Sequence, residues 1–363
     1  MSSRCAMVLR ELHAEGFRCL PLLTFAPDPG LNVIFGDNAQ GKTSLLEAVL
    51  YAATSKSHRT SQETDLVQHG CHGFRIRAAA QRSDRNVVVE ATWWRGEKRF
   101  KVNGVSQSRV SDILGRLPVV FFSPEDAELV RGTASVRRRF LDMALSQLDL
   151  PYLRALQQYR QALRQRNELL KQDQVTGDLL DAWDEQLVRH GTVMVRSRLL
   201  FGQQLANFAA PAYDAIATRE RLELVYLPDI RSDEDYAEVL RENRDRDRRY
   251  GLTSRGPHRD DFELKVEGRP ARQFASQGQQ RSVALALKLA ELKLVRERIS
   301  EYPVLMLDDV LSELDAQRSS RLFNAIPEEA QCLITTTGMA TATVPSGLAC
   351  TLFQIRNGAL TRA

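Results

Sequence analysis

The stretch GDNAQGKT occupies residues 36–43 and matches the phosphate-binding pattern G-x-x-x-x-G-K-[ST]. It follows a short apolar run, Val33-Ile34-Phe35, that is typical of a buried parallel strand. After it, residues 42–53 carry apolar side chains at helical spacing. Because strand, loop and helix in this order are the context that the pattern requires, we expect a P-loop within an α/β fold.

The residues of this loop have separate roles in the predicted site. Glycines let the backbone curl so that several N–H groups point inward, and the N-terminus of the helix adds a favourable dipole. We expect Lys42 to reach the β- and γ-phosphates of ATP and the Thr43 hydroxyl to bind Mg²⁺. The nucleotide-binding residues expected here are Gly36, Asp37, Asn38, Ala39, Gln40, Gly41, Lys42, Thr43 and Ser44.

A second apolar run, residues 304–307, ends in the paired acids Asp308 and Asp309. Such a strand delivers carboxylates to the C-terminal edge of a sheet, where α/β proteins bind ligands. We expect Asp308 to hold Mg²⁺, directly or through water, and Asp309 to orient or deprotonate an attacking water. Many strands end in Asp, so the pattern becomes specific only through its place after a P-loop.

The segment SQGQQR, residues 276–281, precedes that strand and opens a predicted helix of roughly 279–298. It resembles the signature of ABC-type ATPases, usually L-S-G-G-Q, in which Ser276, Gly278 and Gln279 would face a phosphate. The alternative is that Ser276 only caps the helix. Residues 312–315, SELD, resemble the D-loop of the same class. In that class the signature of a second chain completes each site, so the resemblance implies a head-to-tail, ATP-dependent homodimer.

The rest of the chain predicts two further regions. Residues 74–108 alternate in polarity and carry Asn103-Gly104 between two strand-like runs, which indicates an antiparallel sheet beside the P-loop sheet. Ser123-Pro124 predicts the start of a helix, and residues 137–250 are mostly helical in spacing, punctuated by Gly177 and Pro211. We expect an ATPase head at 1–135 and 251–363, split by a helical arm at 136–250.

The composition is that of a globular protein with a mildly basic balance. Of 363 residues, 43% are hydrophobic and 26% charged, and 50 Lys+Arg against 46 Asp+Glu give a net charge of +4. This charge permits nucleic-acid binding without arguing for it. The five cysteines lack CxxC spacing and fit a reduced, cytoplasmic compartment. With no secretory signal and no apolar stretch near about 18 residues, we expect neither export nor a membrane span.

Together these motifs resemble the RecF family, bacterial recombination mediators related to the SMC-type branch of ABC ATPases. The resemblance covers most of the chain, and several further segments carry it: SPED at 123–126, RRRFLD at 137–142, QRN at 165–167, YAEVLRENRDRDRRY at 236–250 and GPHRDD at 256–261. It implies an ABC-type P-loop ATPase head, with a mixed sheet and an antiparallel subsheet, and an inserted helical arm.

The resemblance also implies a function. RecF-like proteins bind single- and double-stranded DNA in an ATP-dependent way, work with RecO and RecR, and help RecA load at gaps and stalled forks, which supports SOS induction. Their ATP hydrolysis is slow, and weak DNA-stimulated activity is expected here. Two departures bear on that activity: Asp309 is shorter than the Glu that is usual in related ATPases, and residues 332–337 carry Thr where a switch His is common.

The DNA-binding surface is open at this level. Arg137, Arg138 and Arg139 form a basic triplet, and the arm adds Arg160, Arg164 and Arg166. These arginines are expected either to bind DNA phosphates or to pair with neighbouring acids such as Asp142 and Glu168. Three other classes compete with the mediator function: an ABC transporter subunit, a P-loop kinase, and a structural SMC-like head with negligible hydrolysis.

Overall fold

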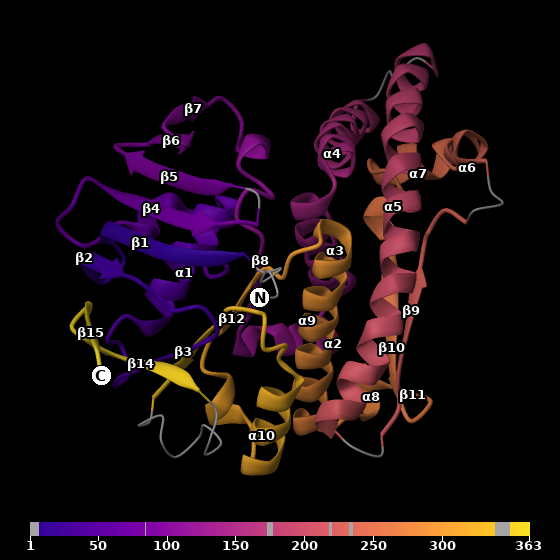
Figure 1. Cartoon of the computed structure of the whole chain (residues 1–363). Coiled ribbons are helices and arrows are strands. Elements are labelled where there is room, and N and C mark those ends of the chain that lie inside the picture. Colours follow the sequence, from indigo (N-terminus) through magenta and orange to yellow (C-terminus); the bar gives the residue numbers. More distant parts are fainter. Residues whose placement is uncertain (1–6, 84, 173–176, 218–219, 232–234, 338–348) are drawn as a thin grey trace. The chain divides into compact units, whose positions relative to one another are not determined.

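A computed structural model describes residues 7–83, 85–172, 177–217, 220–231, 235–337 and 349–363 (Figure 1). By packing, the chain divides into two compact units. Unit 1 comprises Met1–Ala127, Pro211–Glu220 and Ser276–Ala363, and unit 2 comprises Glu128–Ala210 and Arg221–Ala275. The two units are defined by packing and not by function, so the boundaries expected above for the ATPase head and the helical arm stay predictions. Among the described residues, no helix is long and apolar enough to cross a membrane.

The first sheet of unit 1 carries the P-loop. Its strand order is β15-β14-β3-β13-β12-β8, parallel from β14 to β8, with β15 antiparallel to β14. The strands are β3 (Leu31–Phe35), β8 (Val119–Phe122), β12 (Val304–Leu307), β13 (Cys332–Thr336), β14 (Cys350–Arg356) and β15 (Ala359–Arg362). Short apolar runs form β3, β8, β12 and β13 because strands in a parallel sheet are covered on both faces, so these four predictions are confirmed.

The second sheet of unit 1 is antiparallel, with the order β2-β1-β4-β5-β6-β7. Its strands are β1 (Val8–Phe17), β2 (Leu20–Phe25), β4 (Gly73–Gln81), β5 (Asn86–Trp94), β6 (Glu97–Val102) and β7 (Val105–Gln107). Asn103 and Gly104 both have positive φ, 49° and 81°, which is the backbone of the predicted tight hairpin. The expected antiparallel subsheet is therefore confirmed.

Helix α1 (Lys42–Thr54) packs against strands of both sheets, and their side chains share one hydrophobic core. Phe17, Tyr51 and Phe74 meet edge-on or tilted in this core, at ring-centroid distances of 5.2–6.2 Å. Burial on nearly every side explains why α1 lacks a polar face. The P-loop therefore ends in a helix that is fixed along most of its length.

Helix α9 (Gln277–Ile299) confirms the long helix predicted after Ser276, and α10 (Ala316–Ala325) follows β12 through the 3₁₀ turn η5 (Val310–Glu313). The helix predicted at Ser123 is only partly correct. The chain forms the 3₁₀ turn η3 (Pro124–Ala127) and then one short helix, α2 (Glu128–Arg131). Asp126 does accept the Ser123 N–H at 2.8 Å, so the capping residue functions without a long helix behind it.

Unit 2 is mostly helical, as the spacing predicted. Besides α2, its described helices are α3 (Ala134–Leu148), α4 (Leu150–Leu170), α5 (Gly177–Ala217, which continues into unit 1), α6 (Tyr236–Glu242), α7 (Arg244–Tyr250) and α8 (Ala271–Phe274). Pro211 lies inside α5 and does not end it, contrary to expectation. The other 3₁₀ turns of the chain are η1 (Glu63–Leu66), η2 (Val110–Asp112) and η4 (Pro257–Arg259).

The helical prediction for residues 137–250 is wrong at one place. Leu222–Leu227 forms a strand, β9, which pairs antiparallel with β10 (Asp261–Val266); β11 (Arg269–Pro270) completes the sheet in the order β11-β10-β9. The sequence LELVYL alternates buried and more exposed residues, and the pairing partner lies about forty residues later in the chain. The apolar residues on both sides of this segment have helical spacing, and that spacing led to the helical prediction for residues 222–227.

Candidate functional site: a phosphate-binding pocket

Unit 1 contains a cavity of about 650 Å³ where the P-loop meets the C-terminal ends of β3 and β12. Of the predicted loop residues, six line it: Asn38, Ala39, Gly41, Lys42, Thr43 and Ser44. Asp308 and Asp309 line the same cavity. The fold therefore brings together residues more than 260 positions apart, at the sheet edge where α/β proteins bind ligands.

The loop backbone depends on its glycines. A Cβ on Gly36 would lie 2.4 Å from the carbonyl oxygen of Ile355, so only glycine fits between β3 and β14. Gly41, immediately before α1, has a φ of 110°, which side chains rarely tolerate. The curl leaves the N-terminus of α1 without a side-chain cap. These N–H groups are therefore available to an anion.

Lys42 spans the loop. Its Nζ donates to the carbonyl oxygens of Gly36, at 2.6 Å, and Asp37, at 2.7 Å. Burial lowers the pKa of Lys42, and the charges of Asp309, Asp308 and Asp37 oppose that shift. The side chain is held by neutral carbonyls, which a phosphate can replace with a charge-assisted contact.

Three of the predicted loop residues do not line the cavity. Gly36 and Asp37 supply the carbonyls that hold Lys42. The side chain of Gln40 accepts the N–H of Asn357 at 2.6 Å, and its carbonyl accepts the N–H of Gly358 at 3.0 Å. Gln40 therefore ties the P-loop to the β14–β15 hairpin, a positional role that the motif alone did not indicate.

Asp308 is 5% exposed and receives two hydroxyl hydrogen bonds on Oδ1, from Thr335 at 2.6 Å and from Thr43 at 3.1 Å. Burial raises its pKa, and these hydrogen bonds, Thr335 first, oppose the rise. A carboxylate and a hydroxyl this close fit a hard cation that prefers oxygen ligands, such as Mg²⁺. Among the described residues, no group of three His, Cys, Asp or Glu is placed to hold a metal, so phosphate oxygens or waters would have to complete the shell.

Asp309 adopts a left-handed backbone, with φ 48° and ψ 26°. Such a conformation is unfavourable for a residue other than glycine and is concentrated at functional sites. The N–H of Asp309 donates to Thr335 Oγ1 at 2.9 Å, while its carboxylate Oδ1 is buried and has no hydrogen-bond partner among the described residues. Asp309 also lines the cavity, where a carboxylate can accept a hydrogen bond from a water beside the phosphate site.

Ser276 and Gln279 form a reciprocal capping box: Ser276 Oγ accepts the Gln279 N–H at 3.2 Å, and Gln279 Oε1 accepts the Ser276 N–H at 2.8 Å. A Cβ on Gly278 would lie 2.7 Å from Nη1 of Arg318. None of these three residues lines the cavity in the described part of the chain. Ser276 therefore does cap α9. A role for the segment at a nucleotide stays a prediction and requires another molecule's pocket.

The sequence analysis missed several residues that line this cavity, notably His58, Arg59 and Glu125. His58 and Arg59 follow α1 in a turn with no recognisable motif, and Glu125 was assigned only to a helix start. The pairing of β8 with β12 brings Glu125 to the pocket. Residues 58–59 lie there because they closely follow α1, and that short separation is the one signal in the sequence that could have indicated them.

The predicted DNA-binding arginines of unit 2 divide into two groups. Arg137 is 5% exposed and pairs with both carboxylate oxygens of Asp261, at 2.6 and 2.8 Å. Arg166 is fully buried and pairs with Asp184 and Asp247, at 2.5 and 2.7 Å. A DNA-binding role is therefore wrong for these two, whose charges are satisfied inside the unit.

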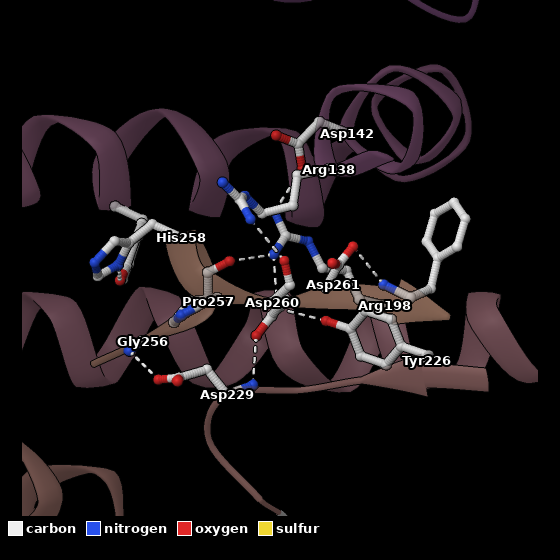
Figure 2. A network of polar contacts seen from close by, with 12 residues as sticks. Arg138, Asp142, Arg198, Tyr226, Asp229, Gly256, Pro257, His258, Asp260 and Asp261 are labelled. Atoms are coloured by element: carbon white, nitrogen blue, oxygen red, sulfur yellow. Dashed lines mark hydrogen bonds and ion pairs between the residues drawn. The ribbon is translucent and has the colours of Figure 1, made fainter. Parts of the chain in front are cut away.

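A connected polar network occupies the centre of unit 2 (Figure 2). Arg198, buried, donates to Asp142, to Asp260 and to the carbonyl of Pro257, each at 2.6–2.7 Å, and Arg138 donates to the carbonyl of Asp260 at 2.7 Å. The segment GPHRDD thus supplies structural partners to α3 and α5. Arg160 is half exposed and pairs with Asp142 at 2.7 Å. Of the predicted arginines, the exposed Arg139 and Arg164 remain as candidates for DNA.

Comparison with protein families shows that residues 8–354 match the family described as "RecF/RecN/SMC N terminal domain". A protein from Symbiobacterium thermophilum named DNA replication and repair protein RecF is 43% identical over 92% of both chains. The protein of the same name from Halalkalibacterium halodurans is 37% identical over 98% of this chain and 99% of its own. The similarity therefore extends over nearly the whole length of each.

Solved structures agree. The recombination mediator protein RecF, solved as RecF-ATP in the RecFOR pathway, superposes with a TM-score of 0.89 at 33% identity, over 99% of this chain and 98% of its own. An Smc head domain from Pyrococcus furiosus superposes with a TM-score of 0.60 at 15% identity, over 98% and 96% of the two chains. The second likeness concerns the fold alone, that of an SMC-type ATPase head.

Proposed function

Because the chain belongs to the RecF family of DNA replication and repair proteins, we propose that it is an ATP-dependent, DNA-binding recombination mediator. The observation that carries the proposal is the P-loop pocket facing Asp308 and Asp309. It has the size of a ligand site and a phosphate cradle at one end. The related structure is solved with ATP, which supports the same nucleotide here.

Within this pocket, the residues of the chain have distinct tasks. Backbone N–H groups at the start of α1 and the Lys42 ammonium bind the phosphates. Thr43 and Asp308 hold Mg²⁺, which supplies neutralisation of phosphate charge when bound. Asp309 orients the attacking water with the carboxylate that lines the pocket. Its side chain is shorter than Glu, which fits slow hydrolysis. By family resemblance, this hydrolysis is weakly stimulated by DNA and times release.

The signature segment acts on a second molecule. Since Ser276, Gly278 and Gln279 lie outside the chain's own pocket, they face the nucleotide of a partner copy. Two copies then close head to tail around two ATPs. Contacts to the γ-phosphate exist only with ATP, so the dimer forms with ATP and weakens with ADP.

On DNA, the dimer binds phosphates of single- and double-stranded segments without sequence preference. By family resemblance, it works in the cytoplasm with RecO and RecR, helps RecA load at gaps and supports SOS induction. The relatives, which are similar to this chain over nearly their whole length, are named for DNA replication and repair. These names argue against an ABC transporter subunit and against a kinase.

A DNA-binding titration with ATP, ADP and no nucleotide, each with Mg²⁺, tests the proposal. Affinity for a gapped duplex should be highest with ATP. ATP turnover should rise on adding DNA and stay constant with small metabolites. Equal DNA affinity in all three nucleotide states would contradict the proposal, and turnover stimulated by a metabolite instead would favour a phosphotransferase.

A further inference from the structure

His58 lies in a turn that is anchored to the P-loop helix. Ser57 Oγ donates to Glu47 in the middle of α1 and accepts the N–H groups of Arg59, at 2.9 Å, and Thr60, at 3.1 Å. Glu47 is fully buried and is held by two hydrogen bonds from Arg18, at 2.8 and 2.9 Å. The position of residue 58 is therefore coupled to the helix that carries Lys42 and Thr43.

The His58 ring packs on one side and lines the nucleotide pocket on the other. Its centroid lies 4.5 Å from that of Phe121 on β8. Phe121 is paired in register with Met306, two residues before Asp308 on the neighbouring strand. The ring therefore lies on the acidic side of the pocket, where the charges of Asp308 and Glu125 act on it and where the terminal phosphate of a P-loop nucleotide would lie.

The Nδ1 atom of His58 is buried and has no hydrogen-bond partner within the described part of the chain. Burial also lowers the pKa of His58, so the ring is neutral and carries one N–H. Because Nδ1 is buried, Nε2 is the ring nitrogen that a ligand in the pocket can contact. A Phe would pack on Phe121 equally well, so packing alone does not account for a polar ring at this place.

The strand that carries a switch histidine in related ATPases cannot supply one here. Its Thr335 already donates to Asp308 at 2.6 Å and accepts the Asp309 N–H at 2.9 Å. Thr335 therefore serves the paired acids, and Thr337 at the strand's end carries no imidazole.

We propose that His58 is a phosphate-sensing residue, which contacts the terminal phosphate of bound ATP through Nε2 and distinguishes ATP from ADP. The inference rests on the nucleotide site proposed above. It assigns to the turn after α1 the imidazole that β13 lacks. His58 acts on the nucleotide held by its own chain, in contrast to the signature segment, which faces a partner's.

The test compares His58→Phe, His58→Gln and Lys42→Ala with the unchanged protein, using equilibrium binding of ADP and of the slowly hydrolysed analogue ATPγS. His58→Phe keeps the packing on Phe121 and removes both nitrogens, while His58→Gln places an amide N–H near the position of Nε2. For His58→Phe we expect ADP affinity within about twofold of the unchanged protein and ATPγS affinity lower by about tenfold, the loss of one hydrogen bond to a charged group. His58→Gln should recover part of that loss.

Two results would overturn the inference: His58→Phe binding ATPγS as well as the unchanged protein, or ADP and ATPγS weakened equally, which indicates a role in pocket shape alone. Lys42→Ala separates this failure from failure of the nucleotide site itself. If Lys42→Ala loses both nucleotides while His58→Phe loses neither, only the His58 assignment fails. Melting temperatures of all variants identify any loss of folding. If His58→Phe does not fold, His58→Leu, which also lacks a polar atom, replaces it as the deciding variant.

Discussion

At the scale of single residues, the paired acids after β12 behave differently although they are adjacent. Asp308 is buried under two threonine hydroxyls, whereas Asp309 adopts a left-handed backbone and keeps Oδ1 without a partner among the described residues. Thr335 contacts both, accepting from one and donating to the other. One threonine therefore fixes the Asp308 carboxylate and the neighbouring backbone together.

The division of roles predicts the effect of Asp309→Asn. The amide keeps the size of the side chain but is a poorer acceptor for a water's proton, so we expect ATP turnover to fall by about 100-fold. ATP affinity should change by less than about threefold, because binding depends on the P-loop and Asp308. Single-turnover hydrolysis and equilibrium binding measure the two quantities separately. Unchanged turnover would remove Asp309 from the reaction.

The sequence predicted the loop and the acids at this scale because each belongs to a motif with fixed spacing around one element boundary. It did not predict His58 or Glu125, since neither lies in such a motif. Glu125 reaches the pocket through the pairing of β8 with β12, and His58 through a turn that is fixed to α1 by Ser57 and Glu47. Arg137 and Arg166 were candidates for DNA, and their partners Asp261 and Asp247 are 124 and 81 positions away in the chain. Tertiary pairing of that kind leaves no local signal.

At the scale of elements, short apolar runs correctly predicted the buried strands, and apolar residues at helical spacing correctly predicted the long helices. The strand β9 was missed because its sequence LELVYL is short and only partly buried, so its partner β10 decides its conformation. Pro211 was expected to interrupt the helical region and lies within α5. Strong local preferences were overridden in both places by packing.

The buried histidine of the turn η4 in unit 2, His258, predicts that the stability of the protein depends on pH. His258 accepts the Tyr159 hydroxyl on Nδ1, at 2.7 Å, and donates from Nε2 to the carbonyl of Thr253, at 3.0 Å. Burial lowers the pKa of His258 to about 4, whereas an unfolded histidine titrates near 6.5. Between those values the unfolded chain binds the additional proton. The contribution is therefore complete above pH 6.5 and is lost as pH falls towards 4, by up to about 3 kcal/mol.

Urea unfolding at pH 7 and pH 5 measures this contribution, with His258→Gln as the control. The unchanged protein should lose more stability between the two pH values than His258→Gln, in which no group titrates at this position. Parallel losses in both proteins would show that His258 contributes nothing to the acid sensitivity.

The exposed arginines of α3 and α4 predict the DNA surface. Charge reversal of Arg139 and Arg164 together should weaken DNA binding. It should also make the slope of log affinity against log salt shallower by about one or two, which corresponds to the loss of about one or two phosphate contacts. Arg99→Glu is the control, because Arg99 is also exposed but lies on β6, in the antiparallel sheet of unit 1. Filter binding or fluorescence anisotropy across a salt series gives both quantities. The same affinity and slope in the double variant would place the DNA elsewhere.

At the scale of the whole molecule, two compact units are built from interleaved segments of one chain. Unit 1 contains the pocket and, outside it, the signature segment with its capping box. Unit 2 contains the arginine network centred on Arg198. The proposed function, in which the signature segment faces the nucleotide of another copy, requires assembly of two copies of this chain.

Sedimentation velocity in the presence of ATP and Mg²⁺ tests this assembly most directly. The unchanged protein should sediment as a monomer without nucleotide or with ADP, and as a dimer with ATP, because the γ-phosphate contacts join the two copies. Lys42→Ala, which removes the ammonium proposed to bind the phosphates, should stay monomeric in every condition. A monomer that does not change with ATP, or a Lys42→Ala protein that dimerises like the unchanged chain, would contradict the account.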